Sequence, residues 1–131
     1  MATIVVADDE PTILEVTAAV LALEGHTVLP AADGAAARAV LSEVVPDLVV
    51  TDVMMPGLDG PDLVRWMRAR PALRDVPVVL TSAAVRPALD GLGPATFLEK
   101  PFDLDALLAA VARRDPAPLS ARRTNPPYSE T

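Results

Sequence analysis

Acidic side chains directly follow two apolar runs of this sequence. Asp8 and Asp9 come after the run 3–7, and Asp52 comes after the run 48–51. Carboxylates that converge raise one another's pKa values unless a cation lies between them. Mg²⁺ takes oxygen ligands, keeps several waters and shares phosphate groups. The acidic residues therefore predict a divalent cation site, with Asp52 as the candidate to form an aspartyl phosphate.

Two further kinds of group at run ends suit phosphoryl chemistry. Thr81 and Ser82 end another apolar run, and Glu99 and Lys100 end a fourth. Lys100 is the single lysine in a chain with ten arginines. A compact ammonium on a flexible stem suits contact with a phosphoryl group, whose transfer depends mainly on charge stabilisation. We therefore expect an acidic pocket that also holds an amine and a hydroxyl.

Each of these residues also has a plain structural explanation. Asp8, Asp9 and Glu10 precede a helical segment, which they could cap or favour through its dipole. Asp52, beside a Pro-Gly loop, could be an ordinary turn residue. Neither explanation accounts for acidic residues at the ends of both runs.

The segments that must position these residues alternate between strand and helix patterns. The expected strands cover 3–7, 27–31, 48–51, 76–81 and 95–98, and the expected helices cover 13–23, 33–45, 61–69 and 103–114. Such alternation predicts an α/β fold, a doubly wound five-stranded parallel sheet with helices on both faces. In such folds, ligands bind beyond the carboxyl ends of the strands, which is where the acidic residues lie.

Length and composition limit the class of protein. The 131 residues suit one domain, and 51% hydrophobic residues exclude disorder of the whole chain. The absence of cysteine removes disulfides, thiolate nucleophiles and zinc–cysteine sites. A formal charge of −7 argues against nucleic acid and anionic membranes as partners. No apolar run approaches a membrane span, so we expect a cytoplasmic protein.

The end of the chain has a different composition from the rest. Prolines at positions 116, 118, 126 and 127 occur among Ser, Thr and Arg residues. This composition is typical of linkers. We expect a folded domain over 1–114 and a flexible Pro-rich tail, or the start of a linker, over 115–131.

Four segments together resemble the receiver domain of bacterial two-component response regulators. They are Val5–Glu10, Asp52–Gly60, Pro77–Ala83 and Glu99–Phe102, in the family's order. The resemblance implies a flavodoxin-like fold with strand order 2-1-3-4-5. It also implies a signalling module that takes a phosphoryl group from a sensor histidine kinase or a histidine phosphotransfer protein. Phosphorylation would switch the module's affinity for a downstream protein.

The resemblance assigns the phosphoacceptor and the cation ligands. It implies that Asp52 accepts the phosphoryl group, with Mg²⁺ or Mn²⁺ as the cofactor. Asp9 would bind the cation directly, Asp8 would bind it through water, and Asp52 would be a further ligand. The backbone carbonyl of Met54 would complete the protein ligands. Lys100 would contact the phosphoryl group and form a cis bond to the following proline.

The resemblance also assigns the switch and the residues that tune the phosphoryl lifetime. Ser82 would turn its hydroxyl toward the phosphoryl group, and Phe97 would be the aromatic switch residue. Met54 lies two residues after Asp52, and Ala84 lies two residues after Ser82. By the resemblance, both side chains would flank the path of the hydrolytic water. Because neither side chain can orient water, we expect a long-lived phosphoryl group.

The interval between Ser82 and Phe97 departs from the family pattern. It is shorter than usual by about one helical turn, roughly four residues. Pro and Gly residues within it also oppose a helix; these are Pro87, Gly91, Gly93 and Pro94. We expect a shortened fourth helix of one or two turns over 86–92, or an irregular loop. The family's fourth helix belongs to its common dimer surface, so we expect a mostly monomeric protein.

Two other functions fit the same fold class less well. Phosphohydrolases of the haloacid-dehalogenase type also use an Asp nucleophile, but place a second Asp two residues later, where this chain has Met54. A flavodoxin-like cofactor binder needs a phosphate-binding loop after the first strand, where Asp8 and Asp9 would repel a phosphate. We therefore expect a phosphoacceptor that is not a turnover enzyme.

Overall fold

The computed structural model describes residues 2–84 and 86–113. Its elements in chain order are β1 (Thr3–Ala7), α1 (Pro11–Leu23), β2 (Thr27–Ala31), α2 (Gly34–Leu41), β3 (Leu48–Asp52), α3 (Gly60–Arg68), the short 3-10 helix η1 (Pro71–Leu73), β4 (Val78–Ser82), β5 (Ala95–Glu99) and α4 (Leu104–Ala112). The segment 115–131, predicted to be a tail, lies outside the described residues. None of the described helices has the length and apolar character that a membrane crossing requires.

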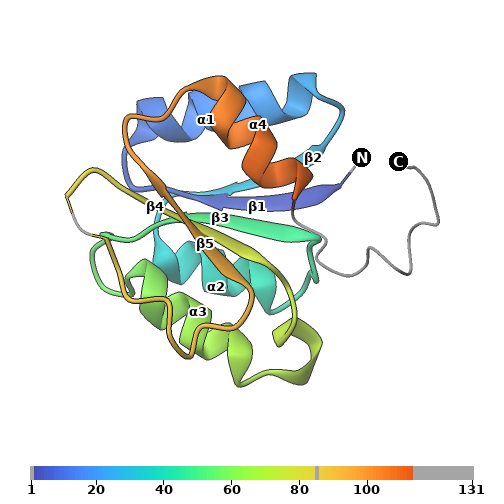
Figure 1. Ribbon diagram of the computed structural model, residues 1–131. Helices are drawn as coiled ribbons and strands as arrows, with labels where there is room; N and C mark the ends of the chain where they lie inside the picture. Colours follow the sequence, from blue (N-terminus) through green and yellow to red (C-terminus); the bar gives the residue numbers. More distant parts are fainter. Residues whose placement is uncertain (1, 85, 114–131) are drawn as a thin grey trace.

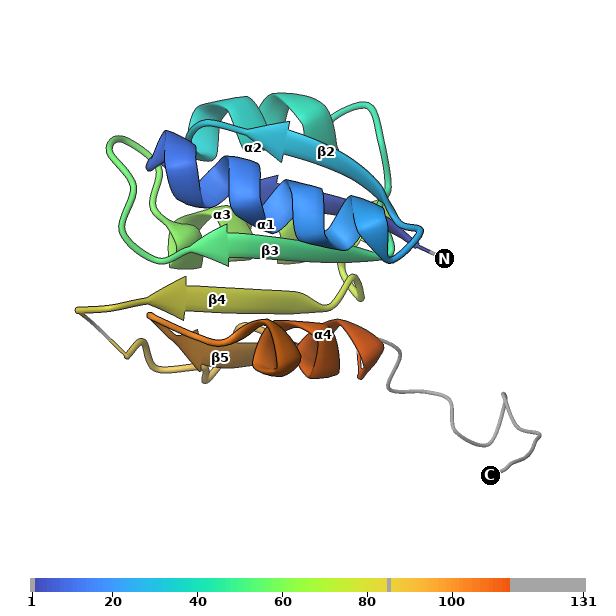
Figure 2. The same ribbon diagram turned by 90° about the horizontal axis from the view of Figure 1, so that it is seen from above.

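The five strands form one parallel sheet in the order β2-β1-β3-β4-β5. Figure 2 shows the arrows side by side, all pointing toward the same edge of the sheet. The prediction of a doubly wound sheet with strand order 2-1-3-4-5 is confirmed. All five carboxyl ends therefore meet at one edge.

Helices cover both faces of the sheet. Helices α1 and α4 lie on one face, and α2 and α3 lie on the other (Figure 1). Side chains alternate between the faces along each strand, so β1 sends Val5 and Ala7 into one core cluster and Ile4 and Val6 into the other. The near-continuous apolar strands of the sequence reflect this two-sided burial.

The same alternation decides where the acidic side chains emerge. In β1, Ile4 and Val6 face α1 and α4, and in β3 Val50 does the same. Asp8 and Asp52 continue this even-numbered series beyond the apolar core. Both carboxylates therefore lie on the α1 and α4 side of the sheet, at its carboxyl edge.

Several predicted boundaries differ from the structure by one or more residues, and two of the predicted elements show a local cause. The helix predicted to reach residue 45 ends at Leu41. Its last turn closes at Ser42, whose hydroxyl donates to the Arg38 carbonyl oxygen at 2.8 Å, a local bond that competes with helix continuation. The strand predicted over 76–81 covers Val78–Ser82 instead, because its pairing with β5 extends to Ser82 and Glu99.

The connection between β4 and β5 is an irregular crossover. Among its described residues, 83–84 and 86–94, the chain forms no helix, so the irregular alternative of the prediction is the one observed. Gly91 and Gly93 have φ angles of +78° and +71°, which glycine adopts without steric cost. Leu92 is 1% exposed and fills the core on the α2 and α3 side.

Arg68, near the end of α3, fixes this crossover to the rest of the domain. Its Nε donates to the Leu92 carbonyl oxygen at 2.6 Å, and Nη2 donates to that of Pro94 at 3.2 Å. Its Nη1 donates to three carbonyls that follow α3, at 2.8–3.1 Å; they belong to Leu73, Arg74 and Val76. A side chain on Gly93 would collide with the Arg68 Nε atom, since an added Cβ would lie 2.6 Å from it. One guanidinium thus binds two backbone segments, 73–76 and 92–94, that lie outside the α-helices.

We predict that Arg68→Met lowers the free energy of unfolding by at least about 2 kcal/mol, because part-buried carbonyls lose their donors. Arg65→Met is the matched control, since Arg65 is exposed on the same helix and, among the described residues, forms an ion pair with the exposed Asp62 alone; it should change the free energy by less than about 0.5 kcal/mol. Urea unfolding measures both values. Equal effects of the two substitutions would contradict the role given to Arg68.

Candidate functional site

The carboxyl ends of β1 and β3 bring three aspartates together. One carboxylate oxygen from each of Asp8, Asp9 and Asp52 lies within 4.8 Å of the others. Asp8 and Asp52 are 5% and 7% exposed, whereas Asp9 is exposed. The convergence that the sequence predicted is therefore present in the structure.

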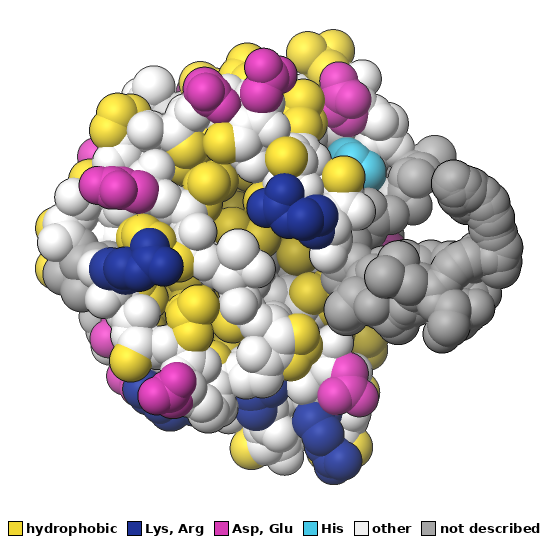
Figure 3. All heavy atoms as spheres, in the orientation of Figure 1, with side chains coloured by type: hydrophobic (Ala, Val, Ile, Leu, Met, Phe, Trp, Pro, Cys, Tyr) yellow, Lys and Arg dark blue, Asp and Glu magenta, His cyan; other side chains and the backbone are white. Residues whose placement is uncertain are grey.

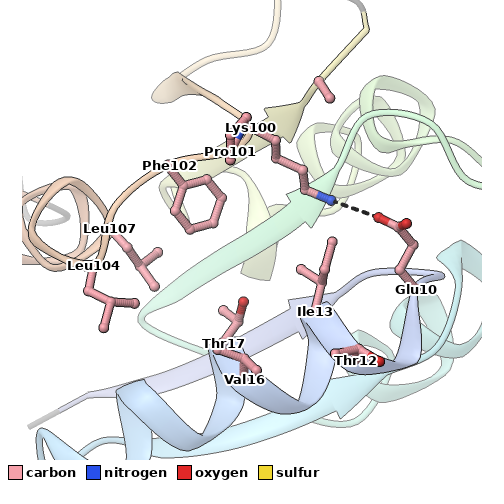
Figure 4. Close-up of a pocket in the computed structure, with 11 residues that line it drawn as sticks. Glu10, Thr12, Ile13, Val16, Thr17, Lys100, Pro101, Phe102, Leu104 and Leu107 are labelled. Atoms are coloured by element: carbon pink, nitrogen blue, oxygen red, sulfur yellow. Dashed lines mark ion pairs between the residues drawn. The ribbon is translucent and has the colours of Figure 1, made fainter.

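Lys100 reaches into this acidic cluster from the end of β5. Its Nζ donates to Asp8 Oδ2 at 2.8 Å and lies 3.5 Å from Asp52 Oδ2. A third carboxylate, Glu10, lies 3.7 Å from the same Nζ, as the dashed line in Figure 4 shows. The Lys100 backbone N–H donates to the Ser82 carbonyl oxygen at 2.9 Å, which ties the lysine to the end of β4. The bond from Lys100 to Pro101 is cis, as the resemblance implied.

Burial and neighbouring charges act together on Asp52. Burial raises the pKa of the Asp52 carboxyl, and the negative charges of Asp8 and Asp9 raise it further. The positive charge of Lys100 opposes them without cancelling them, so the pKa of Asp52 lies above its ordinary value. The site thus holds more negative charge than its own lysine neutralises.

Lys100 responds to the same charges in the opposite sense. Burial alone would lower the pKa of its ammonium group. The hydrogen bond to Asp8, together with the charges of Asp8, Asp52 and Glu10, outweighs burial and raises this pKa above its ordinary value. Lys100 therefore carries its positive charge at neutral pH and is available to meet further negative charge.

Helix capping does not account for the acidic residues before α1. The residue at the N-cap position, Glu10, makes no side-chain cap bond. Asp8 Oδ1 accepts from the Glu10 N–H at 2.9 Å, which shapes the turn before the helix begins. In contrast, the N-cap aspartates of the other three helices each accept a backbone N–H; they are Asp33, Asp59 and Asp103.

A close approach of two backbone segments fixes the loop that follows Asp52. The Gly60 N–H donates to the Val53 carbonyl oxygen at 2.8 Å. A Cβ on Gly60 would lie 2.4 Å from the Asp52 carbonyl oxygen, so a larger residue would push α3 away from the acceptor strand. This role of Gly60 was not predicted from the sequence, although a glycine at the start of a helix was the available signal.

The remaining predicted site residues lie on β4, on β5 and in the loops after β3 and β4. Ser82 is 3% exposed, and its Oγ accepts from the Ala84 N–H at 3.1 Å. Phe97 is half-buried in the middle of β5. Met54 is 55% exposed and Ala84 is exposed as well. The structure thus brings Asp8, Asp9, Asp52 and Lys100 into direct proximity, whereas Phe97 packs against the core on the α2 and α3 side of the sheet.

An apolar hollow of about 410 Å³ opens beside Lys100, between α1 and α4. Figure 3 shows hydrophobic and acidic side chains together on the upper part of the molecule, where α1 and α4 lie. Figure 4 shows Ile13, Val16 and Thr17 of α1 facing Phe102 and the start of α4 across it. This hollow was not predicted from the sequence, because its walls come from segments far apart in the chain.

Comparison of the sequence with known families gives a direct match. The model of the response regulator receiver domain matches residues 4–112. The transcriptional regulatory protein TcrA of Mycobacterium tuberculosis is 39% identical over 120 residues, which cover 88% of this chain and 47% of TcrA. The chain spans about half the length of the curated relatives first matched. No support for a phosphohydrolase of the haloacid-dehalogenase type emerges from these matches.

Solved structures give the same result. The chemotaxis response regulator CheY4 of Vibrio cholerae superimposes with a TM-score of 0.82 and 27% identity, over 88% of this chain and 99% of CheY4. The receiver domain of a sensor histidine kinase of Pseudomonas aeruginosa, with a magnesium ion coordinated in its active site cleft, matches with a TM-score of 0.77 and 29% identity, over 86% of this chain and 96% of that domain. The chain therefore belongs to the response regulator receiver domain family, whose members are phosphorylation-controlled signalling modules.

Proposed function

We propose that Asp52 accepts a phosphoryl group from a phosphohistidine of a sensor histidine kinase or a phosphotransfer protein. An Asp52 carboxylate oxygen attacks the phosphorus atom, and the bond from phosphorus to the histidine nitrogen breaks, leaving its electron pair on that nitrogen. The observation that carries this proposal is the position of Asp52, buried at a strand end and 3.5 Å from the Lys100 ammonium.

Lys100 and Ser82 would hold the phosphoryl group on Asp52. The raised pKa of Lys100 keeps it charged, and its Nζ already lies within reach of the acceptor oxygen. Ser82 is buried at the end of β4, the strand that pairs with β3. Its hydroxyl would turn toward the phosphoryl oxygens, and Phe97 on the neighbouring strand would respond.

The residues of the acidic cluster fit a divalent cation such as Mg²⁺ or Mn²⁺. Three carboxylate oxygens lie within 4.8 Å of one another, and the pKa of Asp52 is raised by burial and further by the charges of Asp8 and Asp9, whose repulsion a cation would relieve. Asp9 and Asp52 would bind it directly, Asp8 through water, and Met54 through its backbone carbonyl. When bound, the cation neutralises charge on the phosphoryl group. Asp52 and Lys100 supply the covalent acceptor and the fixed positive charge.

The apolar hollow beside Lys100 suits the phosphodonor protein. A donor histidine has to approach Asp52 from the carboxyl edge of the sheet, which the hollow adjoins. Val16 and Leu104, at its rim, are 52% and 49% exposed. Apolar side chains of this exposure favour burial against another protein.

The domain would act as a phosphoacceptor without turnover of external substrates. The side chains two residues after Asp52 and Ser82 are Met54 and Ala84, which cannot orient a hydrolytic water, and we infer a long phosphoryl lifetime. The receiver domain would cover 1–114, in the cytoplasm. The irregular crossover replaces the helix of the usual dimer surface, which favours a mostly monomeric protein.

Acetyl phosphate tests the acceptor. Incubation with Mg²⁺ and acetyl phosphate should add one base-labile phosphoryl group to the wild-type chain, as intact mass spectrometry measures. Asp52→Ala should remain unmodified because it lacks the nucleophile. Asp33→Ala, which removes the N-cap aspartate of α2 and none of the carboxylates of the cluster, should be labelled as the wild type is. Labelling of Asp52→Ala at the wild-type level would contradict the assignment of Asp52 as the phosphoacceptor.

Mg²⁺ affinity should depend on pH. Protons and Mg²⁺ compete for the same carboxylates, so affinity falls as the pH is lowered from 7 toward 5. Because the pKa of Asp52 is raised, the fall should begin at a higher pH than for an ordinary aspartate. Isothermal titration calorimetry measures the affinity. Asp9→Asn should weaken binding strongly and Asp33→Asn should not; equal affinity at the two pH values would argue against this site.

A further inference from the structure

Arg86 lies at the start of the irregular crossover, and its guanidinium covers the ring of Phe97. The Arg86 Cζ atom is 5.0 Å from the ring centroid, within the range of a cation–π contact. None of the ion pairs between residues of the described ranges involves Arg86. Contact with the ring is therefore the interaction that positions this exposed cation.

The local sequence presents Arg86 to the ring. Pro87 follows it directly, and the residue before a proline is restricted to extended conformations. At the other end of the crossover, Arg68 fixes the carbonyls of Leu92 and Pro94. Arg68 thus fixes the end of the crossover that leads into β5, and Arg86 contacts Phe97 from its other end.

A surface hollow of about 170 Å³ separates the Phe97 ring from the acceptor side of the site. Its walls are Ser82, Ala83, Ala84, Arg86, Phe97 and Glu99. Cavities of about 150 Å³ accept a benzene molecule, so this hollow has room for the ring. Phe97 therefore has two available positions, one under Arg86 and one beside Ser82.

We propose that Arg86 is a latch that holds Phe97 in the resting position and thereby opposes phosphorylation-dependent switching. The proposal rests on the proposed function, in which Ser82 and Phe97 respond to a phosphoryl group on Asp52. In the resting structure the ring contacts the guanidinium. Arg86 also lines the hollow, but movement of the ring toward Ser82 would break the 5.0 Å contact in its present geometry, so in this proposal Arg86 stabilises the resting state more than the switched state.

The size of the effect follows from linkage. A contact present in only one of two states shifts the equilibrium between them by its full strength. Exposed cation–π contacts correspond to about a two- to five-fold change in an equilibrium constant. Removing the latch should therefore tighten the binding of a phosphoryl mimic by up to about five-fold.

The full chain and the probe beryllofluoride, with Mg²⁺, test the latch. Arg86→Gln removes the charge and keeps a polar side chain of similar length, whereas Arg86→Lys keeps a cation. Arg70→Gln is the matched control, because Arg70, just after α3, lies over the ring of Trp66 at 4.8 Å in a contact of the same kind. We expect Arg86→Gln to bind beryllofluoride about two- to five-fold more tightly than the wild type, with Arg86→Lys between them and Arg70→Gln unchanged.

Fluorine NMR of fluorophenylalanine reports the ring directly, since the chain has only two phenylalanines, Phe97 and Phe102. In Arg86→Gln without ligand, the Phe97 resonance should shift toward its position in the beryllofluoride-bound wild type. Unchanged or weaker beryllofluoride binding by Arg86→Gln, or an unshifted resonance, would overturn the latch. A wild-type chain that fails to bind beryllofluoride would instead overturn the proposed function on which the latch rests.

Discussion

Electrostatic repulsion at one edge of the sheet is the constraint on which the site depends. Asp8, Asp9 and Asp52 bring carboxylate oxygens within 4.8 Å of one another, and the single lysine of the chain provides the opposing charge. Burial makes this arrangement costly, because it removes water that would otherwise solvate the charges. The result is a site that favours added cations and keeps Lys100 protonated.

The rest of the fold serves to keep these groups at that edge. Parallel pairing sends the ends of β1, β3 and β5 to the same side, and the alternation of side chains places Asp8 and Asp52 on one face. The close approach of Gly60 to the Asp52 carbonyl holds α3 against the acceptor strand. Arg68 holds the crossover that leads into β5, and therefore supports the strand that ends at Lys100. Backbone contacts thus keep the mutually repelling side chains close.

The sequence was sufficient for the parts of the structure that local patterns determine. The β-branched runs marked the strands, and the acidic residues at their ends marked the edge where they meet. The prolines and glycines between Ser82 and Phe97 correctly predicted that the described part of this segment forms no long helix. Helix length was less predictable, because the apolar residues Val44 and Val45 continue the helical pattern after the chain has turned at Ser42.

Contacts between distant backbone groups left no pattern in the sequence. Arg68 binds carbonyl oxygens up to 26 residues away, and a carbonyl acceptor is present at every residue whatever its type. The hollow between α1 and α4 is equally hidden, since the segments that line it lie far apart in the sequence. The cation–π contact between Arg86 and Phe97 depends on a crossover whose path only the structure shows.

The free energy of unfolding of Asp52→Asn, measured by urea at pH 7 without divalent cations, tests the central claim about charge most directly. A carboxyl whose pKa is raised on folding destabilises the folded state once the pH exceeds its ordinary pKa. Replacing Asp52 with a neutral residue of the same shape should therefore make the cation-free protein more stable than the wild type. The same substitution should reduce the stabilisation gained on adding Mg²⁺. A cation-free Asp52→Asn protein that is less stable than the wild type would contradict the account.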